Sequence, residues 1–291
     1  MKGKIEDPAA WISDIVKSFI NESPENTMRN KTNEKAWDEP LVAFSNGADP
    51  LYQFYKKDIG EFYLTPLEIF THTFPSVKTT SSQLTVISWI LPQTEATKSE
   101  QRRQTKLPSE RWVRTRIYGE EVNNKLRRHV VSKLQAAGYM AVAPANSPLW
   151  RNERSAKYLF ASTWSERHAA YAAGLGTFGL CDGLITPKGK AMRCGSVISK
   201  IKISASKRPY NDHHAYCLFY SKGICGKCIE RCPVGAISKA GHDKKKCGDY
   251  LDSTREYVIA HYGFDGYGCG LCQVNVPCES GIPGGIEIDK E

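Results

Sequence analysis

The sequence lacks any hydrophobic segment long enough to cross a membrane as a helix. Its longest apolar run, Leu84–Leu91, is the length of a buried strand, whereas a membrane-spanning helix needs about 20 apolar residues. The amino-terminal segment also lacks an apolar core, a twin-arginine pair and a small-residue cleavage site. We therefore expect a cytoplasmic protein with no membrane partner.

The sequence also lacks the glycine motif of a dinucleotide site. No GxGxxG follows a predicted strand, because Gly174, Gly176 and Gly179 follow a predicted helix instead. Neither sign of charge dominates: 40 Lys and Arg stand against 31 Asp and Glu, a net charge of +9. A moderately basic surface suits an acidic electron donor or an anionic substrate.

Cysteine is the residue that the chain has in excess. Ten of its 291 residues are cysteines, and in a reducing compartment these are expected to be metal ligands or catalysts before disulfides. Two lie before residue 204 and eight after it. The length predicts about two domains, so we place a boundary within 204–214 and expect domains over 1–205 and 206–291.

The apolar periodicity predicts a mixed α+β fold in the first two thirds. The expected helices begin at Asp7-Pro8, Asp49-Pro50, Thr65-Pro66, Glu120 and Ser165, and the expected strands are 84–91, 139–144, 184–185 and 196–203. Residues 21–45 are expected to form a surface loop. The basic segment 98–116 is predicted to be a solvated loop, with a nucleic-acid or phosphate site as the alternative.

The clearest motif is Cys225-x2-Cys228-x3-Cys232-Pro233. It matches the last three cysteines of the bacterial ferredoxin run, in which thiolates bind [4Fe–4S] clusters. Cys217 lies upstream and can supply the missing ligand. A second group holds Cys269-x2-Cys272, with Cys278 after it and Cys247 before it.

Two-cluster ferredoxins are cross-wired, in that the last cysteine of each run binds the other cluster. Applied here, this rule uses all eight cysteines: one cluster takes Cys217, Cys225, Cys228 and Cys278, and the other takes Cys232, Cys247, Cys269 and Cys272. The alternative is a zinc ribbon built from the two CxxC pairs. It would leave four cysteines and the Cys-Pro unexplained.

Two segments together carry a resemblance to a known family. The sequence AAYAAGLGTFGLCDGLITPKGKAMRCGSVI (169–198), followed by the cluster motifs with GCGLCQ (268–273), resembles epoxyqueuosine reductase and the reductive dehalogenases. The resemblance implies a nitroreductase-like domain that holds base-off cobalamin, followed by a ferredoxin-like module with two [4Fe–4S] clusters. It also implies that Gly174, Leu175, Gly176, Thr177 and Gly179 line the cobalamin cavity.

The resemblance implies a cobalamin-dependent iron–sulfur reductase that receives electrons from a low-potential ferredoxin or flavodoxin. Where the family has an acidic proton donor, this sequence has Phe160. The candidate acids near that wall are Tyr158, Glu166 and Cys181. The chain stops soon after its second cluster motif, so we expect a small organic substrate in preference to tRNA. The alternative function is a two-cluster electron carrier that serves a partner enzyme.

Overall fold

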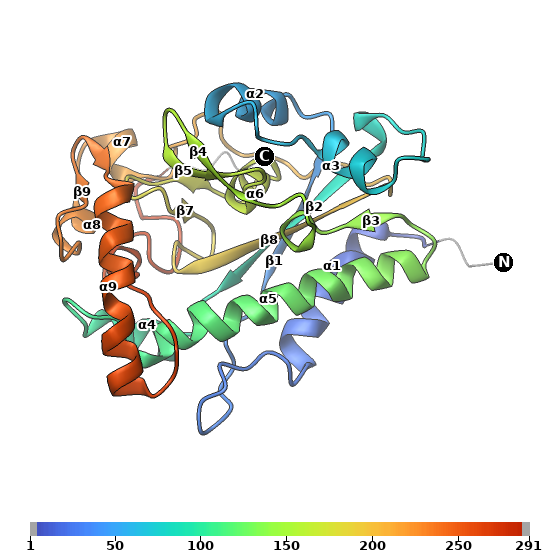
Figure 1. The fold of residues 1–291 in the computed structure, drawn as a ribbon. Helices are drawn as coiled ribbons and strands as arrows, with labels where there is room; N and C mark the ends of the chain where they lie inside the picture. The colour runs from blue at the N-terminus through green and yellow to red at the C-terminus, as the bar shows by residue number, and fades with distance from the viewer. Residues whose placement is uncertain (1–4, 287–291) are drawn as a thin grey trace.

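The computed structural model describes residues 5–286, with an antiparallel sheet at its centre between two helical layers (Figure 1). The strand order is β1 (Leu41–Asn46), β2 (Thr85–Pro92), β8 (Met192–Ser199), β3 (Ala141–Val142). Strand β2 pairs with β8 over its whole length and with β1 over six residues. The buried strand expected at 84–91 is therefore confirmed, and it is an inner strand of the sheet.

The side chains of β2 alternate between the two faces of the sheet, and all eight of its residues are buried. On one face, Ile87 and Trp89 pack against α1 (Pro8–Glu22) and α5 (Glu110–Ala136). Figure 1 shows α5 running across the sheet. Because a strand covered on both faces needs apolar residues at every position, β2 reads as a continuous apolar run.

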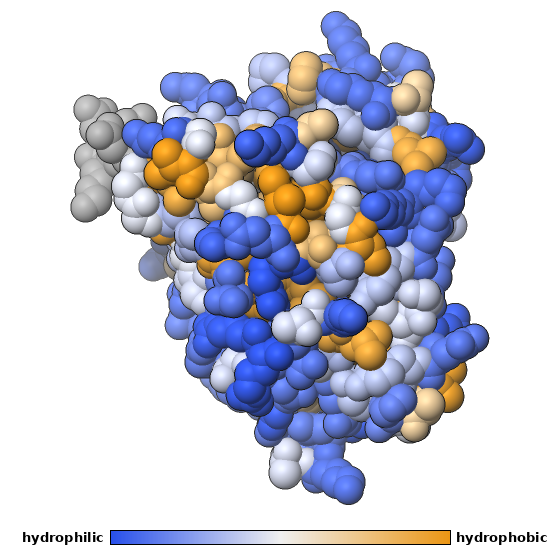
Figure 2. Space-filling view, turned by 90° about the vertical axis from the view of Figure 1, so that its left-hand side faces the viewer, coloured by the Kyte–Doolittle hydropathy of each residue, from blue (hydrophilic) through white to orange (hydrophobic). Residues whose placement is uncertain are grey.

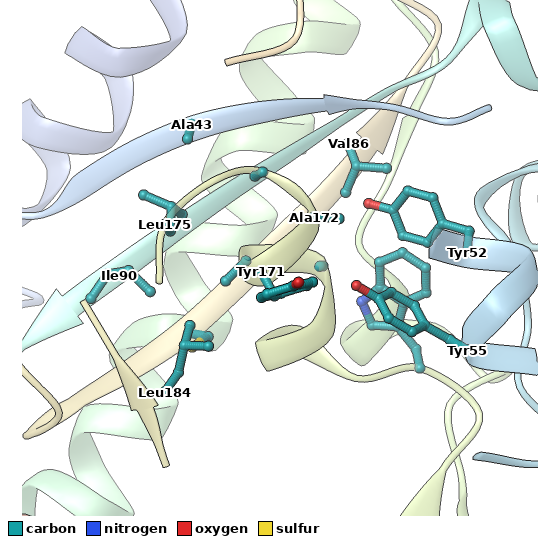
Figure 3. Packing of buried hydrophobic residues seen from close by; sticks show 14 of the residues in the cluster. Ala43, Tyr52, Tyr55, Val86, Ile90, Tyr171, Ala172, Leu175 and Leu184 are labelled. Atoms are coloured by element: carbon teal, nitrogen blue, oxygen red, sulfur yellow. The ribbon is translucent and has the colours of Figure 1, made fainter. Parts of the chain in front are cut away.

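The other face of the sheet is covered by α2 (Pro50–Ile59), α3 (Pro66–Thr73) and α6 (Glu166–Ala172). Figure 3 shows the tyrosines of α2 and α6 gathered beside strand residues such as Val86. Helix α6 contacts β1, β2 and β8. The amino-terminal end of α6 is thereby fixed relative to the sheet, which matters for the site described below.

Shorter elements connect these layers and form the cysteine-rich part. Before residue 206 they are η1 (Ser81–Gln83), α4 (Glu95–Arg102), η2 (Pro144–Asn146), β4 (Asn152–Ser155), β5 (Leu159–Ser162), β6 (Thr177–Phe178) and β7 (Leu184–Ile185). After it they are α7 (Leu218–Lys222), α8 (Lys227–Glu230), β9 (Ile237–Ser238), β10 (Gly241–His242), α9 (Lys244–Tyr262) and η3 (Leu271–Gln273).

The cysteine-rich part packs directly on the sheet domain. Helix α9 lies beside the start of α5 (Figure 1), where the Tyr262 hydroxyl donates to the Pro108 carbonyl at 2.8 Å. At the other end of the interface, the Lys190 N–H donates to the Cys278 carbonyl at 2.8 Å. These contacts fix the cysteines relative to β8. Among the described helices, none is both long enough and apolar enough to span a membrane.

The predicted helix starts are confirmed where the sequence supplies a side chain that caps the helix. Asp7 accepts hydrogen bonds from the Ala9 and Ala10 N–H groups, both at 3.0 Å, and Pro8 occupies the first turn. Thr65 and Glu68 form a reciprocal capping box. These side chains satisfy helix N–H groups that have no partner within the helix.

Three local predictions are wrong. The expected loop 21–45 contains most of β1, and the strand expected at 196–203 is β8, which begins and ends four residues earlier. The basic segment 98–116 is a loop only in its middle: residues 98–102 belong to α4, residues 103–109 connect the helices, and the rest is the start of α5, which begins at Glu110 and not at Glu120. Arg111 pairs there with Glu34 and Glu100. This pairing leaves fewer free cations for a phosphate.

Candidate functional site

Four of the eight downstream cysteines surround a small pocket. Cys217 precedes α7, Cys225 and Cys228 lie at α8, and Cys278 follows η3. The pocket is closed from the sheet side by Leu180 and other apolar residues. These four cysteines are the set that the cross-wiring rule assigns to one cluster.

The other four cysteines line a larger cavity of about 970 Å³. Cys232 follows α8, Cys247 is in the first turn of α9, and Cys269 and Cys272 lie at η3. The volume is at the upper end of the range for small-molecule and cofactor sites. The opposite wall is formed by α5, β8 and the start of α6.

The two CxxC pairs that a zinc ribbon would need to bring together line different hollows, although Cys228 and Cys272 both approach Cys181. Cys225 and Cys228 line the small pocket, whereas Cys269 and Cys272 line the large cavity. Within residues 5–286, no three side chains of the metal-binding types converge as a single ion would require. A cubane differs, because it spreads its four thiolates over four iron atoms.

The environment of the sulfur atoms suits clusters. All ten cysteines are free thiols, and burial raises the pKa of the Cys269 thiol to about 11 and that of Cys278 above its usual value. A bound metal offsets this penalty, because it deprotonates its thiol ligands. The Ala236 N–H donates to Cys232 Sγ at 3.1 Å, and such hydrogen bonds stabilise thiolate ligands.

A buried arginine organises the opposite wall of the large cavity. Arg127 projects from α5 and is 2% exposed. Its Nη1 lies 2.9 Å from Glu120 Oε1, and its Nε lies 3.2 Å from Glu166 Oε1. Both carboxylates also face the cavity. A buried charge of this kind needs such partners to offset its desolvation.

Glu166 is held from the sheet side by two further hydrogen bonds in series. Trp164 Nε1 donates to Ser196 Oγ at 3.0 Å, and that hydroxyl donates to Glu166. Burial raises the pKa of the Glu166 carboxyl, although Arg127 opposes the shift. The side chain is thus a carboxyl that holds its proton more tightly than an exposed glutamate, at the edge of a cavity.

Behind the cavity wall, Arg127 Nε and Glu166 Oε1 form an ion pair, and within the described part of the chain neither atom has a hydrogen-bond partner. Both atoms have almost no accessible surface, so a ligand in the cavity does not reach them. The wall offers such a ligand the Arg193 guanidinium and the Glu120 carboxylate instead, each about one third exposed. A corrin with its amide arms brings both acceptors and donors to these groups, so the residues present fit cobalamin.

A lysine and one of the two upstream cysteines lie between the two hollows. Lys190 Nζ is 3.3 Å from Cys181 Sγ, and both residues are buried. Cys228 and Cys272 approach Cys181 from the two groups and hold the pKa of its thiol well below the usual value. Burial alone would lower the pKa of Lys190, but the surrounding sulfur atoms raise it well above its usual value.

The three candidate acids are placed differently. Glu166 and Cys181 both line the large cavity. Tyr158 instead lies in the hairpin between β4 and β5, and its hydroxyl donates to Asp58 Oδ2 at 2.6 Å. Lysines 157 and 244 lie near the Tyr158 ring. Tyr158 is therefore a partner of surface charges, outside the described lining of the cavity.

Most of the segment 174–179, which was predicted to line the cofactor cavity, is not part of the described cavity wall. Of Gly174, Leu175, Gly176, Thr177 and Gly179, Gly179 lines the small pocket, and the described lining of the large cavity includes none of the five. Gly176 is needed for close packing, because a Cβ there would be 2.2 Å from the Ile185 carbonyl oxygen. Phe160, at the family's acidic position, is 58% exposed and faces Gly248 of α9.

Sequence reasoning did not single out Arg127, Lys190 or Arg193, all of which line the large cavity. For Arg127 a signal was available, since it lies one turn from Asn123 on the buried, mostly apolar face of the helix. A charge on such a face requires a partner. Lys190 carries no comparable local signal, because its surroundings include Cys228, Cys272 and Cys278, which are distant in the sequence.

No family model matches this chain. Epoxyqueuosine reductase from Bacillus cereus is 33% identical over 124 residues, which are 40% of this chain and 30% of that protein. The chain thus spans less than a third of that curated relative. A catabolic reductive dehalogenase in complex with 3-bromo-4-hydroxybenzoic acid aligns with a TM-score of 0.50 and 14% identity, over 95% of this chain and 37% of that one. An epoxyqueuosine reductase crystal structure aligns with a TM-score of 0.46 and 17% identity, over 87% and 64%.

The overall fold is accordingly the mixed α/β fold of that reductive dehalogenase. The matched segment of the chain is similar to epoxyqueuosine reductase, and the chain shares its fold with a reductive dehalogenase, so the resemblance noted in the sequence is confirmed.

Proposed function

We propose that this chain is a cobalamin-dependent iron–sulfur reductase of a small organic substrate. One observation carries the proposal: eight cysteines gather as two groups of four around adjacent hollows, one of which is a cavity of about 970 Å³. In this proposal residues 1–205 are a nitroreductase-like corrinoid domain, and residues 206–291 are a ferredoxin-like module. The location is cytoplasmic.

Two [4Fe–4S] clusters would supply electrons singly, and cobalamin in the large cavity would supply a strongly reducing cobalt centre. Cys217, Cys225, Cys228 and Cys278 hold the cluster at the small pocket. Cys232, Cys247, Cys269 and Cys272 hold the cluster that faces the cavity. The second cluster is thereby placed against the cofactor, and the first is placed toward the surface.

On the side of the cavity opposite the cysteines, the chain's own residues bind the cofactor and supply a proton to the substrate. Arg193 and Glu120 offer a hydrogen-bond donor and an acceptor to the ligand at the cavity surface. Of the three candidate acids, Glu166 is favoured as proton donor because it faces the cavity and burial raises its pKa. Cys181 stays a candidate at the cluster side, whereas Tyr158 is directed to Asp58.

The face that carries α7 and α9 suits a low-potential electron donor such as ferredoxin or flavodoxin. Figure 2 views the molecule from this side and shows small apolar groups among hydrophilic ones. Ile224, next to Cys225, is 75% exposed. Lys222 and Lys227 flank it, which is the charge that an acidic donor would meet.

The test is purification of the full chain without oxygen, after reconstitution with iron, sulfide and cobalamin. We expect about eight iron atoms per chain, a broad iron–sulfur absorption, and a corrinoid that stays with the protein through gel filtration. Glu166→Gln is expected to weaken corrinoid retention. Glu121→Gln, at the same cavity, is the matched control, because Glu121 pairs with Arg29. A colourless protein that carries zinc would overturn the proposal.

The second candidate function is a two-cluster electron carrier. It is favoured by Phe160, which stands where the family has its acid and points to α9 and solvent. The same experiment separates the two functions. A protein that holds both clusters and releases every corrinoid is a carrier.

A further inference from the structure

Lys190 occupies a unique place among residues 5–286. It is the only described residue that lines both the small pocket and the large cavity. Its side chain is 2% exposed. Each hollow is lined by four of the cysteines assigned to one cluster, so a single ammonium group faces both proposed cluster sites.

The fold makes specific room for this lysine. Its backbone N–H donates to the Cys278 and Glu279 carbonyls at 2.8 and 3.1 Å. The preceding Gly189 has a φ of +85°, and a Cβ there would be 2.0 Å from the Glu279 carbonyl oxygen. A Cβ on Gly183 would be 2.9 Å from Lys190 Cδ. Gly189 thus lets the backbone of Lys190 pack against the segment that contains Cys278, and Gly183 leaves room for the aliphatic part of the Lys190 side chain.

The ammonium is surrounded by sulfur. Its Nζ lies 3.3 Å from Cys181 Sγ, and Cys181 contacts Cys228 of the first group and Cys272 of the second. No carboxylate within the described residues forms an ion pair with Lys190, since each recorded ion pair involves other groups. The charge of Lys190 is therefore directed at the cysteines.

We propose that Lys190 is a positioning residue that sets the reduction potentials of the two proposed clusters and lowers the repulsion between them. With both clusters bound, Cys217, Cys225, Cys228 and Cys278 would hold the cluster that gives up one electron and passes from 1+ to 2+, and Cys232, Cys247, Cys269 and Cys272 would hold the cluster that takes it and passes from 2+ to 1+. No proton moves. The electron comes from the low-potential donor class proposed above.

The physical reason is the sign and screening of the charge. A cation fixed in a buried region stabilises the more negative, reduced state of a nearby cluster, and hence raises its potential. Because Lys190 faces both sites, it acts on both potentials. An exposed cation at a similar separation acts weakly, since water and salt screen it.

The experiment is a redox titration of the reconstituted full chain, followed by electron paramagnetic resonance. Lys190→Gln and Lys190→Arg both keep a hydrogen-bond donor on a long side chain, but only the arginine keeps the charge. We expect the potentials of both clusters to be more negative in Lys190→Gln than in the natural chain. Lys190→Arg is expected to stay closer to the natural chain. Lys188→Gln removes an exposed charge two residues away and is expected to leave both potentials unchanged.

Equal potentials in the glutamine and arginine variants would overturn the inference, and so would an equal shift in Lys188→Gln. If one Lys190 variant fails to bind iron, the remaining variant is compared with the natural chain, and the expected order of potentials is the same. The inference rests on the proposed function, but the two fail separately. Absence of iron from the natural chain refutes the clusters, whereas full iron content with unshifted potentials refutes only the role of Lys190.

Discussion

Arg127 Nε and Glu166 Oε1 face each other at 3.2 Å at the edge of the large cavity, and neither atom has a hydrogen bond within residues 5–286. The guanidinium comes from α5 on one side of the sheet, and the carboxylate comes from the first residue of α6 on the other. The pair thus joins the two helical layers beside the edge of β8, where Arg127 contacts the Cys194 carbonyl and Glu166 contacts Ser196. It links the stability of the fold to the chemistry of the cavity.

Removal of the guanidinium should destabilise the protein strongly. Arg127→Met leaves the Glu120 and Glu166 carboxylates without their buried partner, and breaking a buried pair costs about 3–5 kcal/mol. Chemical denaturation should show this loss in the free energy of unfolding. The double variant Arg127→Met with Glu166→Gln should lose less than the sum of the single variants, because it leaves one unpaired charge fewer. Strict additivity would contradict the coupling.

Glu166 should give the stability a pH dependence of known sign. Burial raises the pKa of its carboxyl above the usual 4.5 in the folded chain. The folded state therefore binds the proton more tightly than the unfolded state, so the free energy of unfolding falls as the pH rises through the range between the two pKa values.

In Glu166→Gln the decrease in the free energy of unfolding that comes from titration of this carboxyl should be absent. The measurement is chemical denaturation of both proteins at a series of pH values from about 4 upward. Glu121→Gln serves as the control, since Glu121 lies at the same cavity but pairs with Arg29, and it should keep the pH profile of the natural chain. A Glu166→Gln profile parallel to that of the natural chain would refute the raised pKa.

The sequence could predict what is encoded locally. Asp7 and Thr65 predict helix starts, because their side chains accept hydrogen bonds from N–H groups in the first turn. The continuous apolar run of β2 indicates a strand buried on both faces. The partition of the cysteines into two groups of four follows from the cross-wiring rule of two-cluster ferredoxins, whereas the short CxxC loops alone confine only Cys225 with Cys228 and Cys269 with Cys272.

What escaped prediction depends on contacts between distant segments. The first seven residues of α5 look like part of a solvated basic loop, but Arg111 is paired with Glu34, which lies far away in the sequence. The role of Lys190 depends on Cys278 and Gly183 from other segments. Periodicity within a short window holds no information on such partners.

The contact between α5 and Trp37 offers a test of the packing alone. Trp37 is 1% exposed, its Nε1 donates to the Gly119 carbonyl at 2.9 Å, and a Cβ on Gly119 would be 2.7 Å from the indole ring. Gly119→Ala should therefore destabilise the protein by about 1–3 kcal/mol, despite the better helix propensity of alanine. Ser132→Ala, at an exposed position of the same helix, should leave stability unchanged or slightly raised. Thermal unfolding of both variants checks this prediction.

The two hollows predict that cysteine substitutions fall into two classes with respect to iron. Cys225→Ser and Cys269→Ser each replace a thiolate with a poorer ligand, at the small pocket and at the cavity respectively. Each should lower the iron content from about eight to about four atoms per chain, and the remaining paramagnetic signals should differ between them. Cys194→Ala should keep all the iron, because burial raises the pKa of this thiol to about 12 and its Sγ contacts the Met192 sulfur. Identical residual signals in the two serine variants would mean that the cysteines form one shared site, which the separation of the hollows argues against.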